Sequence, residues 1–176
     1  ISANGGWKTI IPEFNLDGDL PEGIYTTNEE EFLNRFVISS ARRKWLGERL
    51  QEFFALARST GKLERVFVWG SFVSAKESPN DVDLLLLMSN DFRLENVSES
   101  CKVLFDHFGS RMRFHADVFW SKSSISEEIL QLWLDTYQTT KDFKRRGIVE
   151  VKLTWFKMMN RWQEPNNPFL TCKRSS

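Results

Sequence analysis

The sequence has no excess of charge of either sign, because 24 lysine and arginine residues balance 24 aspartate and glutamate residues. A chain without a global positive field has little means of holding a long nucleic acid, so we expect no such partner. No apolar run is long enough to span a membrane, and no secretory signal peptide is recognisable, so we expect no membrane partner either.

Cysteine is also scarce. Cys101 and Cys172 lie far apart in the sequence and do not form the close spacing of a metal site. Two such cysteines in a chain without a signal peptide are typical of a reducing compartment. We therefore expect a cytoplasmic protein with both thiols reduced.

Apolar and aromatic residues, by contrast, are plentiful. Of 176 residues, 41% are hydrophobic and 14% are aromatic, which is typical of a globular protein and excludes a disordered one. This length suits one domain with a real core. We predict a single domain over residues 1–176, with a flexible tail at 1–9 and a frayed end at 170–176.

One stretch, residues 65–88, organises the rest of the chain. It contains two apolar runs of strand length, Val66 to Trp69 and Val82 to Met88. The first run breaks at Gly70-Ser71, and a turn sequence, Ser78-Pro79-Asn80, leads into the second. We predict two strands joined by a loop.

Two carboxylates stand where the second of these strands begins. Asp81 is also compatible with the turn, but Asp83 lies between apolar residues, where an unpaired carboxylate would be costly to desolvate. Side chains two apart on a strand share a face, so Asp81 and Asp83 point the same way. In the absence of a Cys or His cluster, such a pair suits a hard divalent cation such as Mg²⁺.

The turn between the strands offers groups that bind phosphate. Gly70 and Ser71 would present backbone N–H groups and a hydroxyl, ahead of an expected helical turn over 72–76. Lys76 lies in the same loop, where it either reaches a triphosphate or forms ordinary loop surface.

Gly70-Ser71, nine residues and then Asp81-Val82-Asp83 between apolar runs resemble the signature of the polymerase-beta-type nucleotidyltransferase superfamily in its minimal form. The wider frame is similar to a little-characterised microbial group in that superfamily. This frame comprises IPEFNLDGDLPEGIY, TTNEEEFLNRF and RRGIVEVKL.

The resemblance implies a third carboxylate on a later strand. Alternation over 111–120 predicts a strand, in which Asp117 is the anomalous residue and matches that place. The resemblance implies that Asp81 and Asp83 hold two Mg²⁺ ions, for which Mn²⁺ can substitute. It also implies that Asp117 binds the second ion and helps to deprotonate the attacking hydroxyl. The alternative for Asp117 is a structural pair with Arg113 or His115.

The remaining patterns predict the other elements. Helical spacing begins after a capping box at Thr27 and Glu30 and breaks at Ser39-Ser40. Further helices are expected over 97–108, ended by Gly109, and over 123–137, capped by Ser124 or Ser126; a last short helix is expected over 155–162. A strand is expected over 148–153, and residues 10–25 are either an extended arm or a surface loop. We predict an α+β fold with a small mixed sheet of about four strands and helices mainly on one face.

Two basic clusters remain ambiguous. Arg42, Arg43 and Lys44 contact phosphates or form a solvated helix face. The run KDFKRR, residues 141–146, binds a triphosphate or an anionic acceptor, or is a soluble connection.

The sequence therefore favours a Mg²⁺-dependent enzyme that moves a nucleoside monophosphate from an NTP, most readily ATP, to a hydroxyl. No long helical domain is expected after the core, which favours single transfer over polymerisation. The preferred acceptor is a partner protein. The alternative is an antitoxin-like or other partner-binding module that keeps the nucleotidyltransferase fold.

Overall fold

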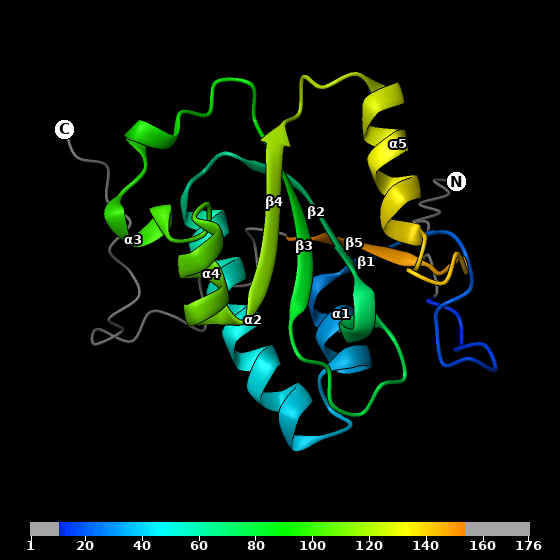
Figure 1. Cartoon of the computed structure of the whole chain (residues 1–176). Helices are drawn as coiled ribbons and strands as arrows, with labels where there is room; N and C mark the ends of the chain where they lie inside the picture. Colours follow the sequence, from blue (N-terminus) through cyan, green and yellow to red (C-terminus); the bar gives the residue numbers. More distant parts are fainter. Residues whose placement is uncertain (1–10, 154–176) are drawn as a thin grey trace, which may run out of the picture.

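Five strands form one mixed sheet in the order β1-β5-β2-β3-β4 in the computed structural model, which describes residues 11–153 (Figure 1). The two outer pairs, β1 with β5 and β3 with β4, are parallel, whereas β2 runs antiparallel to both β5 and β3. The predicted α+β fold with a small mixed sheet is confirmed. The strand bounds are Ile24–Asn28 (β1), Leu63–Trp69 (β2), Val82–Met88 (β3), Ala116–Lys122 (β4) and Ile148–Lys152 (β5).

Polar side chains fix where the helices begin. The break predicted at Ser39-Ser40 is confirmed, because Ser40 accepts a hydrogen bond from the Arg43 N–H and caps α2. Ser126, one of the two expected caps, accepts from Ile129 and begins α5. The helices are Glu29–Phe36 (α1), Ala41–Ser59 (α2), Glu99–Lys102 (α3), His107–Phe114 (α4) and Glu127–Gln138 (α5), with 3₁₀ turns at Gly70–Val73 (η1) and Leu94–Asn96 (η2).

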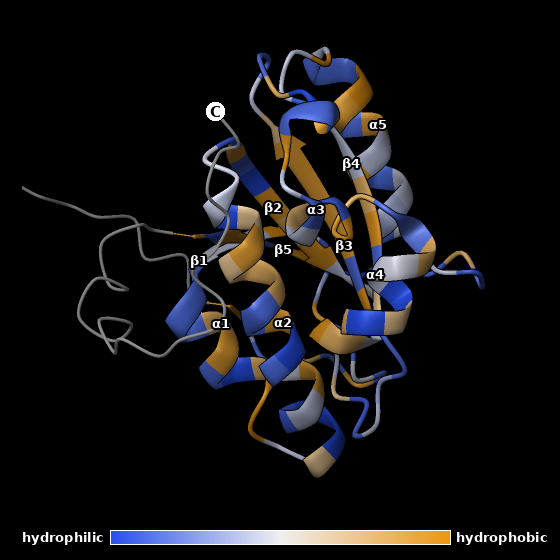
Figure 2. Ribbon diagram, turned by 90° about the vertical axis from the view of Figure 1, so that its left-hand side faces the viewer, coloured by the Kyte–Doolittle hydropathy of each residue, from blue (hydrophilic) through white to orange (hydrophobic). Residues whose placement is uncertain are grey.

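The central strands of the sheet are made mainly of apolar residues (Figure 2). Because successive side chains of a strand alternate, these residues pack on both faces of the sheet. On one face, residues such as Val68 and Leu84 pack with the buried side chains of α1, α2, α3 and α4. On the other face, residues such as Phe67 and Leu85 pack with Leu130 and Leu134 of α5. Helices therefore cover mainly one face, as expected, and α5 alone packs on the other among the described helices.

The sheet has one strand more than the sequence predicted. The stretch expected as an arm or a loop over 10–25 runs into β1, which pairs with β5 from Ile24↔Ile148 to Asn28↔Lys152. The sequence of β1, IYTTN, carries no apolar run, because this strand lies at the edge of the sheet. The capping box at Thr27 is also wrong by one residue, since Asn28 caps α1 by accepting from the Glu31 N–H.

The prediction for residues 97–120 was wrong in detail. The expected helix over 97–108 is only one turn, α3, and Gly109 lies inside α4 instead of ending a helix. Residues 111–114 end α4 rather than open a strand. Asp106 caps α4 by accepting from the Gly109 N–H, and His115, at φ 51°, ends it in the left-handed region, so β4 starts at Ala116.

The remaining expectations concern the cysteines, the location of the protein and the ends of the chain. Cys101 is buried and disulfide-bonded, so the reduced thiol expected there is wrong. Because disulfides are rare in a reducing cytosol, the cytoplasmic location stays a prediction. No helix within residues 11–153 is long and apolar enough to cross a membrane. The tails at 1–9 and 170–176 and the helix at 155–162 lie outside the described residues.

Candidate active site

Three carboxylates predicted from the sequence gather on the face of the sheet that α5 partly covers. Asp83 of β3 and Asp117 of β4 are direct partners in the parallel register, and Trp69 of β2 is the partner of Asp83 on the other side. Asp81 lies one residue before β3 and two before Asp83, so it belongs to the same face. The three side chains are half-buried. Strand register therefore brings together residues that lie up to 36 positions apart.

Asp83 is the most strongly perturbed of the three. Its pKa is raised from 3.8 to about 6, first by burial and then by repulsion from Asp81 and Asp117. The positive charges of Arg146 and Arg111 oppose this shift only in part. The metal-free protein thus bears an electrostatic cost at this place, which a bound cation would offset.

Arg111 of α4 supplies the nearest positive charge. Its Nη1 lies 3.2 Å from Asp117 Oδ1 and its Nη2 lies 3.9 Å from Asp81 Oδ2, so the guanidinium bridges two of the carboxylates. In this arrangement, no three His, Cys, Asp or Glu side chains among residues 11–153 stand close enough together to hold a metal ion. The Arg111 side chain is half exposed, which leaves it room to swing away.

Asp117 retains an acceptor that the protein does not use. Its Oδ1 is buried and accepts no hydrogen bond within the described part of the chain, because the Arg111 contact is an ion pair without hydrogen-bond geometry. His107 Nε2 lies 4.0 Å from the same atom. Neither partner weighed from the sequence pairs with Asp117. Arg113 pairs with Glu52, and the ring of His115 packs against Trp45.

Gly70 is required by its contact with Asp83. Its φ is +82°, and a Cβ there would meet Asp83 Oδ2 at 2.1 Å. The Gly70-Ser71 turn therefore lies directly against the middle carboxylate. The Ser71 side chain makes no hydrogen bond to another described residue, so its hydroxyl can serve a ligand. The sequence analysis assigned this turn to phosphate binding and did not predict the contact between Gly70 and Asp83.

Arg43 holds this turn in place, a role that neither of the two sequence interpretations foresaw. Its side chain is only 2% exposed, so it is neither a solvated helix face nor a phosphate contact. The guanidinium donates to backbone carbonyls of α1, the turn and the following loop: Phe36, Ser71, Phe72, Ser74 and Lys76. Arg42 similarly donates to the carbonyls of Pro79 and Asn80. Helix α2 thus anchors the loop that runs from Gly70 to Asp81, while the Lys76 side chain stays exposed.

Aromatic rings stand beside the carboxylates on the same face. Trp69 and Tyr137 stack with centroids 3.9 Å apart, and Phe119 lies 6.0 Å from Trp69 and 5.9 Å from Tyr137. Phe119 follows Asp117 by two residues on β4 and is 46% exposed. A ring that reaches solvent in this position can stack on a nucleobase. The alternation over 111–120 already places Phe119 on the face of Asp117, but the sequence analysis assigned it no role.

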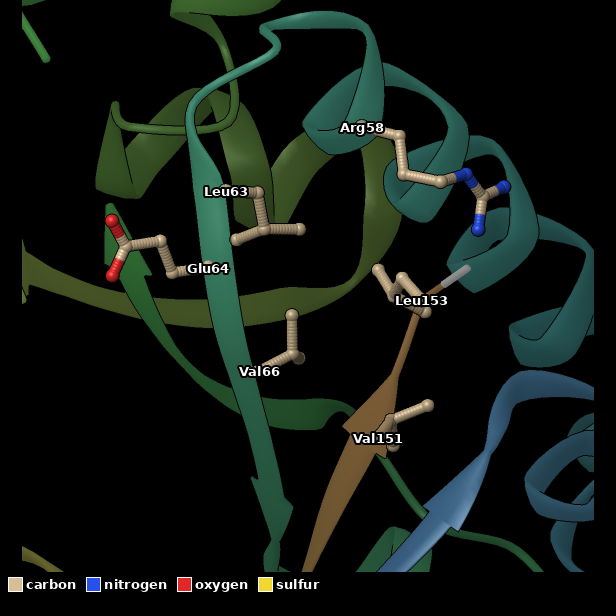
Figure 3. A pocket seen from close by; sticks show the side chains of 6 residues that line it. All are labelled: Arg58, Leu63, Glu64, Val66, Val151 and Leu153. Atoms are coloured by element: carbon tan, nitrogen blue, oxygen red, sulfur yellow. The ribbon is translucent and has the colours of Figure 1, made fainter. Parts of the chain in front are cut away.

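A small hollow lies elsewhere and is open to solvent (Figure 3). Leu63 begins β2 and Trp69 ends it, so the hollow and the carboxylates are at opposite ends of that strand. Val66 and Val151 place it on the opposite face of the sheet as well. The hollow takes no part in the candidate site. Its lining residues are Arg58, Leu63, Glu64, Val66, Val151 and Leu153.

Comparison with known proteins adds a family but no activity. A search of curated proteins and a search of solved structures each found no match. One family model matches residues 12–152, which include every residue of the candidate site and the whole sheet. That match covers most of the chain, so the protein belongs to the family of unknown function DUF6932.

Proposed function

We propose that this protein is a Mg²⁺-dependent nucleotidyltransferase that moves a nucleoside monophosphate from an NTP, with ATP the preferred donor, to a hydroxyl. The observation that carries the proposal is the meeting of Asp83 and Asp117 as cross-strand partners, with Asp81 on the same face. The resemblance of Gly70-Ser71 and Asp81-Val82-Asp83 to the polymerase-beta-type signature supports the same reaction.

The donor set fits a hard divalent cation. Carboxylate oxygens are the ligands that Mg²⁺ prefers, and Asp117 Oδ1 is a buried acceptor that receives no hydrogen bond from the described residues. Asp81, Asp83 and Asp117 would hold two Mg²⁺ ions, or Mn²⁺ in their place, once Arg111 moves aside. When bound, the metal would neutralise phosphate charge and favour the deprotonated acceptor hydroxyl.

The chain's own residues then have separate roles in the transfer. The acceptor oxygen attacks the α-phosphorus, the bond to the bridging α,β oxygen breaks, and pyrophosphate leaves with that electron pair. Asp117 accepts the hydroxyl proton at its unsatisfied Oδ1. The Gly70-Ser71 turn and Lys76 contact the phosphates, and Phe119 offers the nucleobase a stacking surface.

The acceptor that we favour is a hydroxyl on a partner protein. The balance of charge over the whole sequence gives no large basic surface for a long nucleic acid. A cytoplasmic location belongs to the same proposal, since ATP is the donor.

Labelling of the NTP at either of two phosphates tests the reaction. The protein is incubated with Mg²⁺, a cell lysate and each NTP in turn, labelled either at the α- or at the γ-phosphate. We expect label from α-labelled ATP on a discrete protein band and none from γ-labelled ATP, with the signal lost in Asp81→Asn. Transfer from the γ position would indicate a kinase. Label on RNA ends or on a small metabolite would refute the protein acceptor, and no transfer from any NTP would refute the enzyme.

One observation favours a second candidate, a partner-binding module of antitoxin type that keeps the fold without turnover. Arg111 already bridges Asp81 and Asp117, and such an ion pair can serve as a permanent substitute for a metal. This candidate predicts that Mg²⁺ and ATP leave the melting temperature unchanged in the wild type. The enzyme predicts a rise that requires both ligands.

A further inference from the structure

The basic run at residues 141–146 has four cations, of which two form ion pairs and two, Lys141 and Arg146, form none with a described residue. Lys144 pairs with Asp17 at 3.1 Å, and Arg145 pairs with both Glu22 at 2.8 Å and Asp135 at 2.6 Å. Lys141 is exposed at the surface of the loop. The guanidinium of Arg146, by contrast, forms neither a hydrogen bond nor an ion pair with any described residue.

Arg146 lies on the face of the sheet that carries the carboxylates. Its N–H donates to the Gln138 carbonyl at 2.8 Å, which fixes the backbone just ahead of β5. Ile148, two residues later, packs on the same face as Trp69, so alternation directs Arg146 to that face as well. In the antiparallel register of β5 with β2, the start of β5 lies beside the end of β2, so Arg146 stands at the end of the sheet where the Gly70-Ser71 turn follows β2.

Arg146 has an unmet need for an acceptor. Its Nε is buried and donates to no acceptor among residues 11–153, although the side chain as a whole is half-buried and reaches solvent. A buried donor without a partner is costly, and an anion that enters from solvent would remove this cost. Arg146 is also close enough to Asp83 to lower that residue's pKa, yet it forms no ion pair with it.

The order of residues across the sheet matches the order of groups in an in-line displacement. From β5 to β4 the order is Arg146, the Gly70-Ser71 turn, Asp81 with Asp83, and Asp117. The attacking hydroxyl and the leaving pyrophosphate must lie on opposite sides of the α-phosphorus. Asp117 serves the hydroxyl side, which leaves the pyrophosphate on the side of β5.

We infer that Arg146 binds the β- and γ-phosphates of the nucleoside triphosphate and stabilises the departing pyrophosphate. This inference rests on the proposed function, and it gives one residue of the basic run a contact with substrate. The planar fork of an arginine suits two phosphate oxygens at once, which a lysine cannot reproduce.

The test compares ligands that share the α-phosphate but differ beyond it. Dissociation constants for ATP, AMP and inorganic tripolyphosphate are measured by calorimetry with Mg²⁺, for the wild type and for Arg146→Ala, Arg146→Lys and Lys141→Ala. We expect Arg146→Ala to weaken ATP and tripolyphosphate by about 10- to 100-fold, the loss of a charge-assisted hydrogen bond, and to leave AMP nearly unchanged. Arg146→Lys should recover only part of the loss, and Lys141→Ala should bind all three ligands as the wild type does.

The possible failures are distinguishable. If the wild type binds ATP and Arg146→Ala binds it with equal affinity, the inference is overturned and the proposed function still stands. Equal weakening of ATP and AMP would also overturn it, because Arg146 would then act on the fold or on the α-phosphate. No binding of any of the three ligands by the folded wild type would remove the proposed function and this inference together. Arg146→Lys provides the comparison should Arg146→Ala fail to fold.

Discussion

Asp83→Asn should stabilise the metal-free protein, although it removes a residue placed at the centre of the candidate site. In the wild type, burial and repulsion from Asp81 and Asp117 raise the pKa of Asp83 from 3.8 to about 6. A shift of this size corresponds to a cost of about 3 kcal/mol for the ionised form in the folded state. Asparagine keeps the shape of the side chain and removes the charge.

The expected gain is smaller than this cost, because a half-buried amide needs hydrogen-bond partners where the carboxylate stood. We expect Asp83→Asn to raise the free energy of unfolding by about 1–2 kcal/mol at pH 7.5, which is about 2–8 °C in melting temperature for a chain of this length. A bound divalent cation should stabilise the wild type more than the variant, because only the wild type keeps all three carboxylates that would hold it. Addition of Mg²⁺ and ATP should therefore raise the melting temperature of the wild type and not that of the variant.

The pH dependence gives a sharper test than the single value. A carboxyl with a raised pKa binds more protons in the folded than in the unfolded state, so its contribution to stability is present below pH 3.8 and is lost as the pH rises through about 6. The advantage of Asp83→Asn should consequently be small at pH 4.5 and complete above about pH 7.

Urea unfolding followed by tryptophan fluorescence measures both stabilities between pH 4.5 and 8. Asp91→Asn is the matched control, because Asp91 is exposed, pairs with Lys62 and has a lowered pKa, so its loss should bring no gain. A destabilisation of more than about 1 kcal/mol in Asp83→Asn at pH 7.5 would refute the reasoning and mark Asp83 as a structural ion-pair partner.

Three other variants test the surroundings of the site. Arg43→Ala should lower the free energy of unfolding by about 3 kcal/mol or more in urea, because the carbonyls of Phe36, Phe72, Ser74 and Lys76 lose the donor that Arg43 provides. Lys44 is the exposed neighbour, and Lys44→Ala should change the free energy of unfolding by less than about 0.5 kcal/mol. Gly70→Ala should lower the free energy of unfolding by about 2 kcal/mol or more, because its Cβ would meet Asp83. When Asp83 is also changed to alanine, the cost of Gly70→Ala should fall to the strain of the positive φ alone. An unchanged cost would show that the two residues do not meet. Arg111→Ala should tighten Mn²⁺ binding about fivefold in a thermal-shift titration, because a half-exposed competing cation is worth about 1 kcal/mol; weaker binding would make Arg111 a supporting residue and not a competitor.

The sequence predicted the elements whose patterns are local and unambiguous. The apolar runs of β2 and β3, the break before Ala41 and the cap at Ser126 follow from periodicity and side-chain capping, and the structure confirms each. The edge strand β1 was missed because strand pairing at an edge needs no apolar run. The start of β4 was misplaced because Met112 and Phe114 alternate with arginines in a way that also suits a strand, while the helix that they form is set by the cap at Asp106.

The gathering of the site residues was predictable only in part. Two aspartates that are two apart on a strand share a face from sequence alone, but the resemblance was needed to select Asp117 from the other carboxylates. The burial of Arg43 beside the exposed Lys44 was missed, although Arg43 lies three residues before Leu46 and so shares the apolar face of the helix. Arg111 was likewise invisible as a partner, since its position depends on α4 replacing the expected strand.

The central claim is that Asp81, Asp83 and Asp117 hold divalent cations for nucleotidyl transfer. A crystal structure with Mn²⁺ and an ATP analogue that cannot be cleaved between the α- and β-phosphates tests it most directly, because anomalous scattering locates the metal. The account predicts Mn²⁺ bound to carboxylate oxygens of the three aspartates and to phosphate oxygens, with the Arg111 guanidinium moved away from Asp117. Nucleotide bound elsewhere, or Arg111 still bridging Asp81 and Asp117 with no metal beside them, would contradict it.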